Sequence, residues 1–186
     1  MKATGIVRRI DDLGRVVIPK EIRRTMRIRE GDPLEIYTDR EGEVIFKKYS
    51  PIGELTAFAS QYAETLHRTC GLAVVICDRD TVVASSGVSK KDFADKPLSE
   101  AMGKIMEARS LYLHPQEKEW LPVTAEDGEF KIHCAMPILS EGDIVGCVAS
   151  LQNPNEPENR ASRPELDVET KLILTAAGFL GRQLEG

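Results

Sequence analysis

The first 50 residues have the sequence pattern of a small separate unit that cannot form a hydrophobic core by itself. Large apolar side chains are few there, and they fall in short β-branched runs between turn signals. A unit of this size buries too little apolar surface to be stable alone unless something else contributes to its core. Interleaved strands from two copies would supply a shared core. The sequence therefore predicts a dimer on grounds of size alone.

Turn residues and a proline divide this unit into short elements. Pro19 suits the first turn of a helix, where its missing N–H has no helical partner. Gly14 and Gly42 supply the positive φ that tight turns need. The expected strands are residues 4–10, 15–18, 34–38 and 44–49, and the expected helix is residues 20–26.

The charge of the chain is divided unevenly between its two parts. Residues 1–50 hold 12 Lys and Arg against 9 Asp and Glu, a net charge of +3, although the whole chain carries −5. A basic end on an acidic body is typical of a nucleic-acid-binding unit joined to a domain that stays away from phosphates. A merely solvated basic face is the alternative that charge alone leaves open.

An amphipathic helix at residues 53–70 joins the basic unit to a larger domain. Leu55, Phe58 and Leu66 follow helical spacing, and Gly71 stands where a C-terminal cap is expected. Pairing of this helix between subunits and packing on the domain's own sheet are both open. The expected divisions are 1–50 for the basic unit, 51–71 for the linking helix and 72–186 for the larger domain.

The larger domain has the pattern of an α+β fold. Strands are expected at 72–77, 81–86, 130–139 and 144–151, with helices from Pro97 and over 165–184. Long polar stretches at 109–129 and 152–163 separate them. Alternation along residues 130–139 places Phe130, Ile132, Cys134, Met136 and Ile138 on one side, and Lys131 and His133 on the other.

The stretch from Leu13 to Pro19, Leu-Gly-Arg-Val-Val-Ile-Pro, is the most specific motif in the chain. With its setting over residues 1–50, it resembles the swapped-hairpin DNA-binding domain of the transition-state regulator AbrB and its relatives. The resemblance implies a β-rich dimer with interleaved hairpins, in which Val16, Val17 and Ile18 form a shared core. By motif position, the residues that it implies for contact with double-stranded DNA are Arg8, Arg15, Arg23 and Arg24, with Arg9 and Lys20 as helpers.

Arginine chemistry supports these assignments, because the guanidinium offers a planar fork of donors to phosphate oxygens or a guanine edge. The alternative is that some of these arginines only pair with Asp11, Asp12 or Glu21. Antitoxins share the fold, but they usually follow it with a short toxin-wrapping tail. Here a folded domain follows, which disfavours an antitoxin.

The second part resembles a GAF domain, a sensor fold with a central antiparallel sheet and helices at both ends. The resemblance rests on element order and on the hairpin 130–151 with its Gly142 turn. The Asn-Lys-x-Phe-Asp-Glu signature of the cyclic-nucleotide class is missing from the sequence. A ligand pocket would lie between the sheet and the loops 87–97 and 109–129. Its candidate polar liners are Ser85, Ser86, His114 and His133, with Trp120 as a lid, although capping, solvation or packing would also explain them.

An AbrB-like unit joined to a GAF-like domain implies a cytoplasmic, nucleoid-associated regulator of sporulation genes that activates some and represses others. We expect double-stranded DNA and further copies of the chain as partners, in a dimer and, through the second domain, a tetramer. An unknown small-molecule effector is a further expected partner, whereas no membrane, cofactor, metal or catalytic residue is expected. Two alternatives remain: a purely structural second domain, and a redox enzyme like methionine sulfoxide reductase that uses Cys77, Cys134 and Cys147. Small core hydrophobes are the simpler reading of these cysteines.

Overall fold

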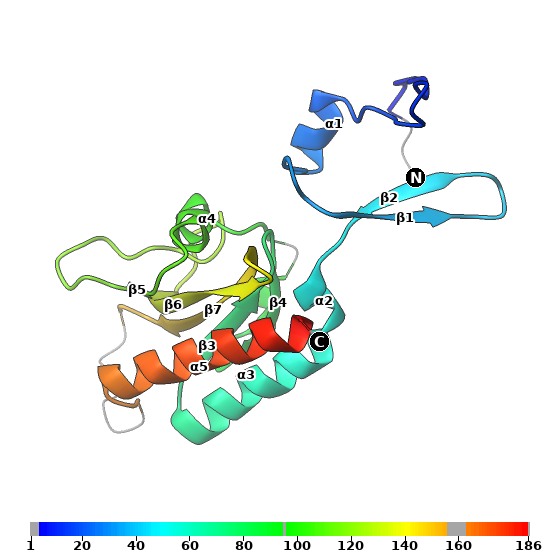
Figure 1. Cartoon of the computed structure of the whole chain (residues 1–186). Helices are drawn as coiled ribbons and strands as arrows, with labels where there is room; N and C mark the ends of the chain where they lie inside the picture. The colour runs from blue at the N-terminus through cyan, green and yellow to red at the C-terminus, as the bar shows by residue number, and fades with distance from the viewer. Residues whose placement is uncertain (1–3, 95, 156–162, 186) are drawn as a thin grey trace. The chain divides into compact units, whose positions relative to one another are not determined.

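The computed structural model describes residues 4–94, 96–155 and 163–185, and the chain divides into two compact units (Figure 1). The first unit ends at Tyr49 and the second begins at Ser50. Among the described residues, the whole hydrophobic core belongs to the second unit, where Ile52 is its first member. Residues 156–162 of the expected polar loop lie outside the described residues.

The first unit has a short helix followed by an antiparallel hairpin. Its elements are α1 (Lys20–Thr25), β1 (Leu34–Thr38) and β2 (Val44–Lys48). The register pairs Leu34 with Lys48 and Thr38 with Val44, which confirms the expected hairpin. Pro19 precedes α1 as expected, and Met26 caps the helix instead of extending it.

The strands expected at residues 4–10 and 15–18 are not formed in the described chain, so the prediction of four strands is wrong for these two. A strand needs a neighbour to take up its backbone hydrogen bonds, and a single copy offers none here. Their apolar side chains consequently remain in solvent, with Val7 86% and Val17 71% exposed.

The second unit contains a five-stranded antiparallel sheet in the order β4-β3-β7-β6-β5. Helices α3 and α5 lie side by side over one face, and α4 with long loops covers the other (Figure 1). This architecture confirms the α+β class and the antiparallel sheet that the GAF resemblance implies. The strands are β3 (Ala73–Cys77), β4 (Val82–Ser86), β5 (Tyr112–Leu113), β6 (Lys131–Ser140) and β7 (Asp143–Gln152).

The expected linking helix is two helices, α2 (Pro51–Glu54) and α3 (Thr56–Cys70), with a break at Leu55. Because α3 packs against β3 and β4, the helix covers its own sheet. Gly71, at φ +69°, caps α3 in the left-handed conformation as expected. The other helices are a 3₁₀ turn η1 (Lys90–Asp92), α4 (Glu100–Glu107) and α5 (Leu166–Leu184).

Helix α4 begins three residues after Pro97, because the hydroxyl of Ser99 accepts a hydrogen bond from the Met102 N–H at 3.0 Å and forms the N-cap. No helix within the described ranges has both the length and the apolar composition to span a membrane.

The sheet separates two hydrophobic clusters, and β6 contributes to both. Ile132 packs in the cluster on the α4 side, whereas Cys134 and Ile138 pack in the cluster beneath α3 and α5. The expected alternation along residues 130–139 is therefore wrong at its start. A β-bulge between Ile132 and Cys134 adds one residue, and this reverses the face on which the following side chains lie.

Candidate nucleic-acid interface

The turn from Asp11 to Arg15 fixes one of the expected DNA-contacting side chains. Oδ1 of Asp11 accepts hydrogen bonds from the backbone N–H groups of Leu13 at 3.0 Å and Arg15 at 2.8 Å. Oδ2 accepts a third from Nε of Arg15 at 2.8 Å. The backbone and side-chain hydrogen bonds from Arg15 lower the pKa of Asp11, so the pair is ionic at neutral pH.

Arg15 thus forms the ion pair that the sequence left open as an alternative to DNA contact. Its side chain nevertheless stays 69% exposed. Only Nε is engaged, and neither terminal nitrogen is hydrogen-bonded to another described residue. A guanidinium held in this way keeps both terminal nitrogens, each with two N–H donors, for a phosphate or a guanine edge.

Helix α1 carries three of the expected basic residues. Lys20 begins the helix, while Arg23 and Arg24 lie in its last turn, and all three are exposed. Positive side chains suit a helix C-terminus because its free carbonyl groups carry partial negative charge. None of the three forms an ion pair with a residue that the structure describes.

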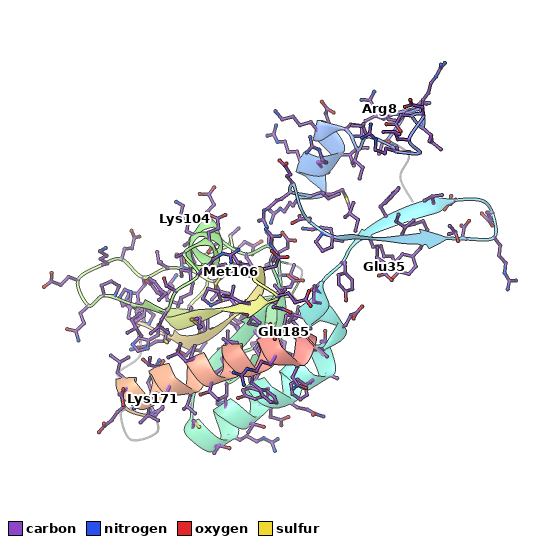
Figure 2. The ribbon with its side chains drawn as sticks, in the orientation of Figure 1. Arg8, Glu35, Lys104, Met106, Lys171 and Glu185 are labelled. Carbon is purple, nitrogen blue, oxygen red and sulfur yellow. The ribbon has the colours of Figure 1, made fainter. Side chains whose placement is uncertain are left out.

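Arg8 and Arg9 precede the turn, and both are exposed. Figure 2 shows the Arg8 side chain extending away from the ribbon. Neither residue has a hydrogen bond or ion pair with another part of the described chain. All six expected residues therefore present solvated positive charge, although no contact joins them into one cluster in a single copy.

A polar contact that the sequence did not predict ties the segment after α1 to the hairpin. Nζ of Lys48 donates to the Arg27 carbonyl at 2.9 Å and lies 3.9 Å from Oδ2 of Asp32. The same oxygen accepts from the Arg29 N–H at 2.7 Å, and the Asp32 side chain is only 4% exposed. The sequence analysis assigned no contact to Asp32.

The expected ligand-contacting residues of the second unit are only partly brought together. The His114 and Trp120 rings stack with their centroids 3.6 Å apart, and the centroids of the Trp120 and His133 rings are 6.1 Å apart. Burial, together with His133, lowers the pKa of His114. Nδ1 of His114 is buried and has no hydrogen-bond partner among the described residues. Ser85 and Ser86 lie on β4, at the edge of the sheet opposite β5, and they do not join this group of rings.

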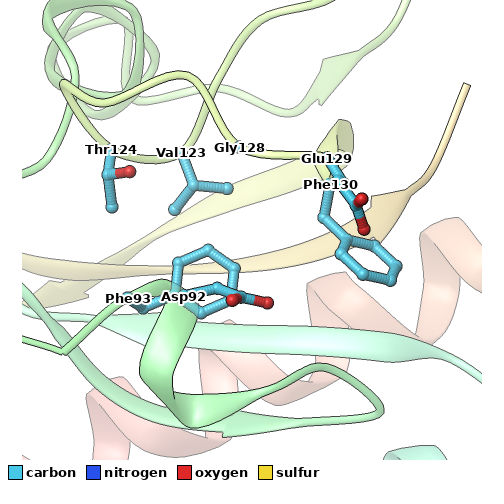
Figure 3. Close-up of a pocket in the computed structure, with 7 residues that line it drawn as sticks. All are labelled: Asp92, Phe93, Val123, Thr124, Gly128, Glu129 and Phe130. Atoms are coloured by element: carbon cyan, nitrogen blue, oxygen red, sulfur yellow. The ribbon is translucent and has the colours of Figure 1, made fainter.

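A pocket lies between the two expected loops, which supply all of its lining residues except Phe130 (Figure 3). Its empty space, including the part open to solvent, is about 250 Å³. None of the five expected residues borders it. The described residues that line it are Asp92, Phe93, Val123, Thr124, Gly128, Glu129 and Phe130.

Sequence reasoning missed a buried carboxylate on α5. Glu169 is 1% exposed, and its Oε1 accepts hydrogen bonds from Ser150 Oγ at 2.5 Å and Arg163 Nη2 at 2.6 Å. Nδ1 of His133 lies 2.9 Å from the same oxygen. Burial by itself raises the pKa of Glu169, but His133, Arg163 and Ser150 outweigh it and bring the pKa to about 2. A charged residue four positions before buried Ile173 was the available signal.

The cysteines have the properties of core side chains. Cys77, Cys134 and Cys147 are fully buried, and Cys70 is half-buried. Burial raises the pKa of the Cys134 thiol to about 12 and also raises that of Cys77 and Cys147. Because thiolate is the reactive form, none of these three is poised for nucleophilic chemistry.

Two family profiles match the chain. The family described as "Stage V sporulation protein T C-terminal, transcription factor" matches residues 54–185, and "Antidote-toxin recognition MazE, bacterial antitoxin" matches residues 7–53. Stage V sporulation protein T of Bacillus subtilis is 52% identical over 185 residues, with 100% of this chain and 99% of the relative covered. The transition state regulatory protein AbrB of the same organism is 65% identical over 51 residues, which are 27% of this chain and 52% of AbrB.

A crystal structure of a methyl-accepting chemotaxis protein, residues 122 to 287, is similar in fold with a TM-score of 0.50. It is 20% identical and covers 70% of this chain and 88% of its own. The AbrB resemblance of the first unit agrees with the 65% identity to AbrB, and the combination of units expected for stage V sporulation protein T is confirmed along the full chain. The chain therefore belongs to the Stage V sporulation protein T C-terminal, transcription factor family.

Proposed function

We propose that this protein binds double-stranded DNA as a dimer and regulates transcription of sporulation genes, activating some and repressing others. Its first unit is the DNA-binding part, and it acts in the cytoplasm on the nucleoid. One observation carries the proposal. The unit most similar to AbrB holds solvated arginines together with apolar side chains that its own fold leaves uncovered.

The exposed apolar side chains support a dimer. Most of the described large apolar side chains of this unit are exposed and none is buried. Such a unit gains little from folding alone, since burial of apolar area is the main favourable contribution. Strands contributed by a second copy would pair with residues 4–10 and 15–18 and cover them. The side chains in question include Ile6, Val7, Ile10, Leu13, Val16, Val17, Ile36, Val44 and Phe46.

The exposed basic side chains support DNA as the partner. Phosphate contacts set the position of a protein on the duplex, while a few base contacts and DNA deformability select sites. A twofold dimer doubles each of these side chains and brings both sets to one duplex. The proposed contact residues are Arg8, Arg9, Arg15, Lys20, Arg23 and Arg24.

The second unit is proposed to join two such dimers into a tetramer. Phe58 and Tyr62 of α3 form an aromatic cluster with Phe179 of α5, and Phe179 is 41% exposed. A partly exposed aromatic cluster shared by two adjacent helices favours a self-associating surface.

Sensing of a small molecule is the finer proposal for the second unit. Among the expected residues, we favour His114, Trp120 and His133 as ligand contacts, because their rings stack against one another. No observation favours Ser85 or Ser86. An enzymatic role based on cysteines is disfavoured by the buried, high-pKa thiols described above.

The proposal is tested by fluorescence anisotropy with a labelled mixed-sequence duplex across a salt series. The intact chain is compared with the combined variant Arg8→Ala, Arg15→Ala, Arg23→Ala, Arg24→Ala. We expect steep salt dependence for the parent, and a loss of about 100-fold or more in the variant, because eight phosphate-neutralising charges leave the dimer.

The matched control removes four exposed lysines from the second unit. It carries the substitutions Lys90→Ala, Lys91→Ala, Lys104→Ala and Lys118→Ala. This control changes net charge equally and is expected to keep the parent's affinity and salt slope. Equal loss in both variants would show that total charge matters rather than the first unit, and a parent that binds no duplex would reject the function.

A further inference from the structure

The first unit contains two turns built in the same way. In the turn from Asp11 to Arg15, Oδ1 of the aspartate accepts from the N–H groups two and four residues later, at 3.0 Å and 2.8 Å. In the turn from Asp39 to Glu43, Oδ1 accepts from the corresponding groups, also at 3.0 Å and 2.8 Å. Backbone hydrogen bonds close both turns, and a glycine at the fourth position has φ +76° in one and +85° in the other.

The two turns differ in what the second carboxylate oxygen does. In the first turn the fifth residue is Arg15, and Oδ2 of Asp11 accepts from its Nε at 2.8 Å. In the second turn the fifth residue is Glu43, and Asp39 makes no side-chain contact with a described cation. The turn geometry therefore does not require the guanidinium contact, which is an addition specific to the first turn.

We propose that Asp11 is a positioning and specificity-determining residue for DNA recognition, an inference that rests on the proposed function. It clamps Arg15 through Nε and directs both terminal nitrogens toward the DNA as a pre-formed fork. A fork held in one orientation favours a bidentate partner such as the O6 and N7 edge of guanine. A freely rotating arginine would serve any phosphate.

The negative charge of Asp11 contributes in the same direction. A carboxylate beside a basic side chain weakens its attraction to phosphates along any DNA sequence, so nonspecific binding is reduced. Asp11 therefore fixes the orientation of Arg15 but weakens the attraction of this side chain to phosphates of any sequence. Asp11 thus raises the ratio of specific to nonspecific affinity rather than affinity as such.

The test separates the two oxygens of Asp11. The Asp11→Asn substitution keeps an amide oxygen to accept from the two backbone N–H groups, but places an N–H₂ group against Nε of Arg15. Asp39→Asn is the matched control, because its turn has the same backbone hydrogen bonds without the guanidinium contact. Arg15→Ala and the double variant with Asp11→Asn complete the set.

Dissociation constants of the full chain are measured for two probes. One is a 30-base-pair duplex that the parent selects from a random pool, and the other is sonicated mixed-sequence genomic DNA. We expect Asp11→Asn to lower the ratio of specific to nonspecific affinity about tenfold, with no loss of nonspecific binding. Asp39→Asn is expected to leave the ratio unchanged, and the double variant to match Arg15→Ala, because the two residues act as one unit.

Two further readouts exclude a merely structural role. Sedimentation equilibrium is expected to show the same assembly for all variants. The Nε–H proton of Arg15, followed by NMR, is expected to exchange with water slowly in the parent and fast in Asp11→Asn. If Asp11→Asn leaves the ratio of specific to nonspecific affinity unchanged, including by raising both affinities equally, the positioning role of Asp11 is overturned. If Arg15→Ala binds both probes as the parent does, the proposed DNA contact of Arg15 fails instead.

Discussion

In the second unit, Ile52, Val148 and Leu180 come from three distant parts of the sequence and are all fully buried. In the first unit, Val7 and Val17 remain 86% and 71% exposed, although they belong to the same residue type that fills the core of the second. The larger unit closes its core with its own chain. The smaller one lacks the surface to do so, and its apolar side chains are available to another copy.

This difference reverses the usual relation between exposure and sensitivity to substitution. Replacing an exposed side chain in a single chain normally changes stability by less than about 0.5 kcal/mol. In the first unit, exposed apolar positions are expected to be the sensitive ones, because they become interior in the dimer. In the second unit, sensitivity follows burial within one chain.

The largest effect is expected from Val17→Lys. If Val17 lies in a shared core, a lysine there must be buried without a partner, which costs several kcal/mol and dissociates the dimer. Sedimentation equilibrium should then show dissociation, and anisotropy should show loss of DNA binding. Val17→Ile is the control, since it remains apolar and β-branched with one more methylene and should preserve the dimer. A Val17→Lys protein that assembles normally contradicts the shared core.

The next effect is expected in the interior of the second unit. Glu169→Ala leaves Arg163 and His133 without the buried carboxylate and should lower the free energy of unfolding by about 3 kcal/mol. Trp120 is the only tryptophan, so its fluorescence during urea unfolding reports on this unit. Lys171→Ala, which removes an exposed ion pair with Asp167 on the same helix, should change the free energy by less than about 0.5 kcal/mol.

Acid should lower the free energy of unfolding of the second unit through the carboxylate of Glu169. The pKa of Glu169 is about 2 in the folded protein, below its ordinary value of 4.5. Between these values the unfolded chain binds a proton that the folded chain does not, so this contribution is present above pH 4.5 and is lost as the pH falls toward 2. Glu169→Gln should flatten that part of the pH profile of urea unfolding. An identical profile for parent and variant would contradict this assignment.

The smallest effects are expected from a pair of glycines, one in each unit. Gly14→Ala forces a side chain into a backbone with φ +76° and should destabilise by about 1 kcal/mol. Gly103 lies within α4 with open space around its Cα, and Gly103→Ala should stabilise by about 0.5 to 1 kcal/mol. Urea unfolding of each variant checks the two signs, and equal signs would rule out the backbone explanation.

Much of the fold could be predicted because its signals are local. The hairpin Leu34–Thr38 with Val44–Lys48, the cap at Gly71 and the position of Pro19 before α1 depend on residues a few positions apart. The arginine set came from a motif rather than from geometry. The pairing of Arg15 with Asp11 was considered only as an alternative to DNA contact, yet both terminal nitrogens of Arg15 remain without a hydrogen bond to another described residue.

The sequence by itself determined most of the turns and caps and the approximate positions of the helices, because those choices depend on backbone preferences within a few residues. It also determined that the first unit is too small to stand alone. The tertiary structure alone decided which face of β6 Cys134 occupies, since a bulge there shifts the register. It also decided that Glu169 is interior, and that residues 4–10 form no strand in one copy. Burial and strand pairing depend on partners distant in sequence or in another chain, which local patterns do not specify.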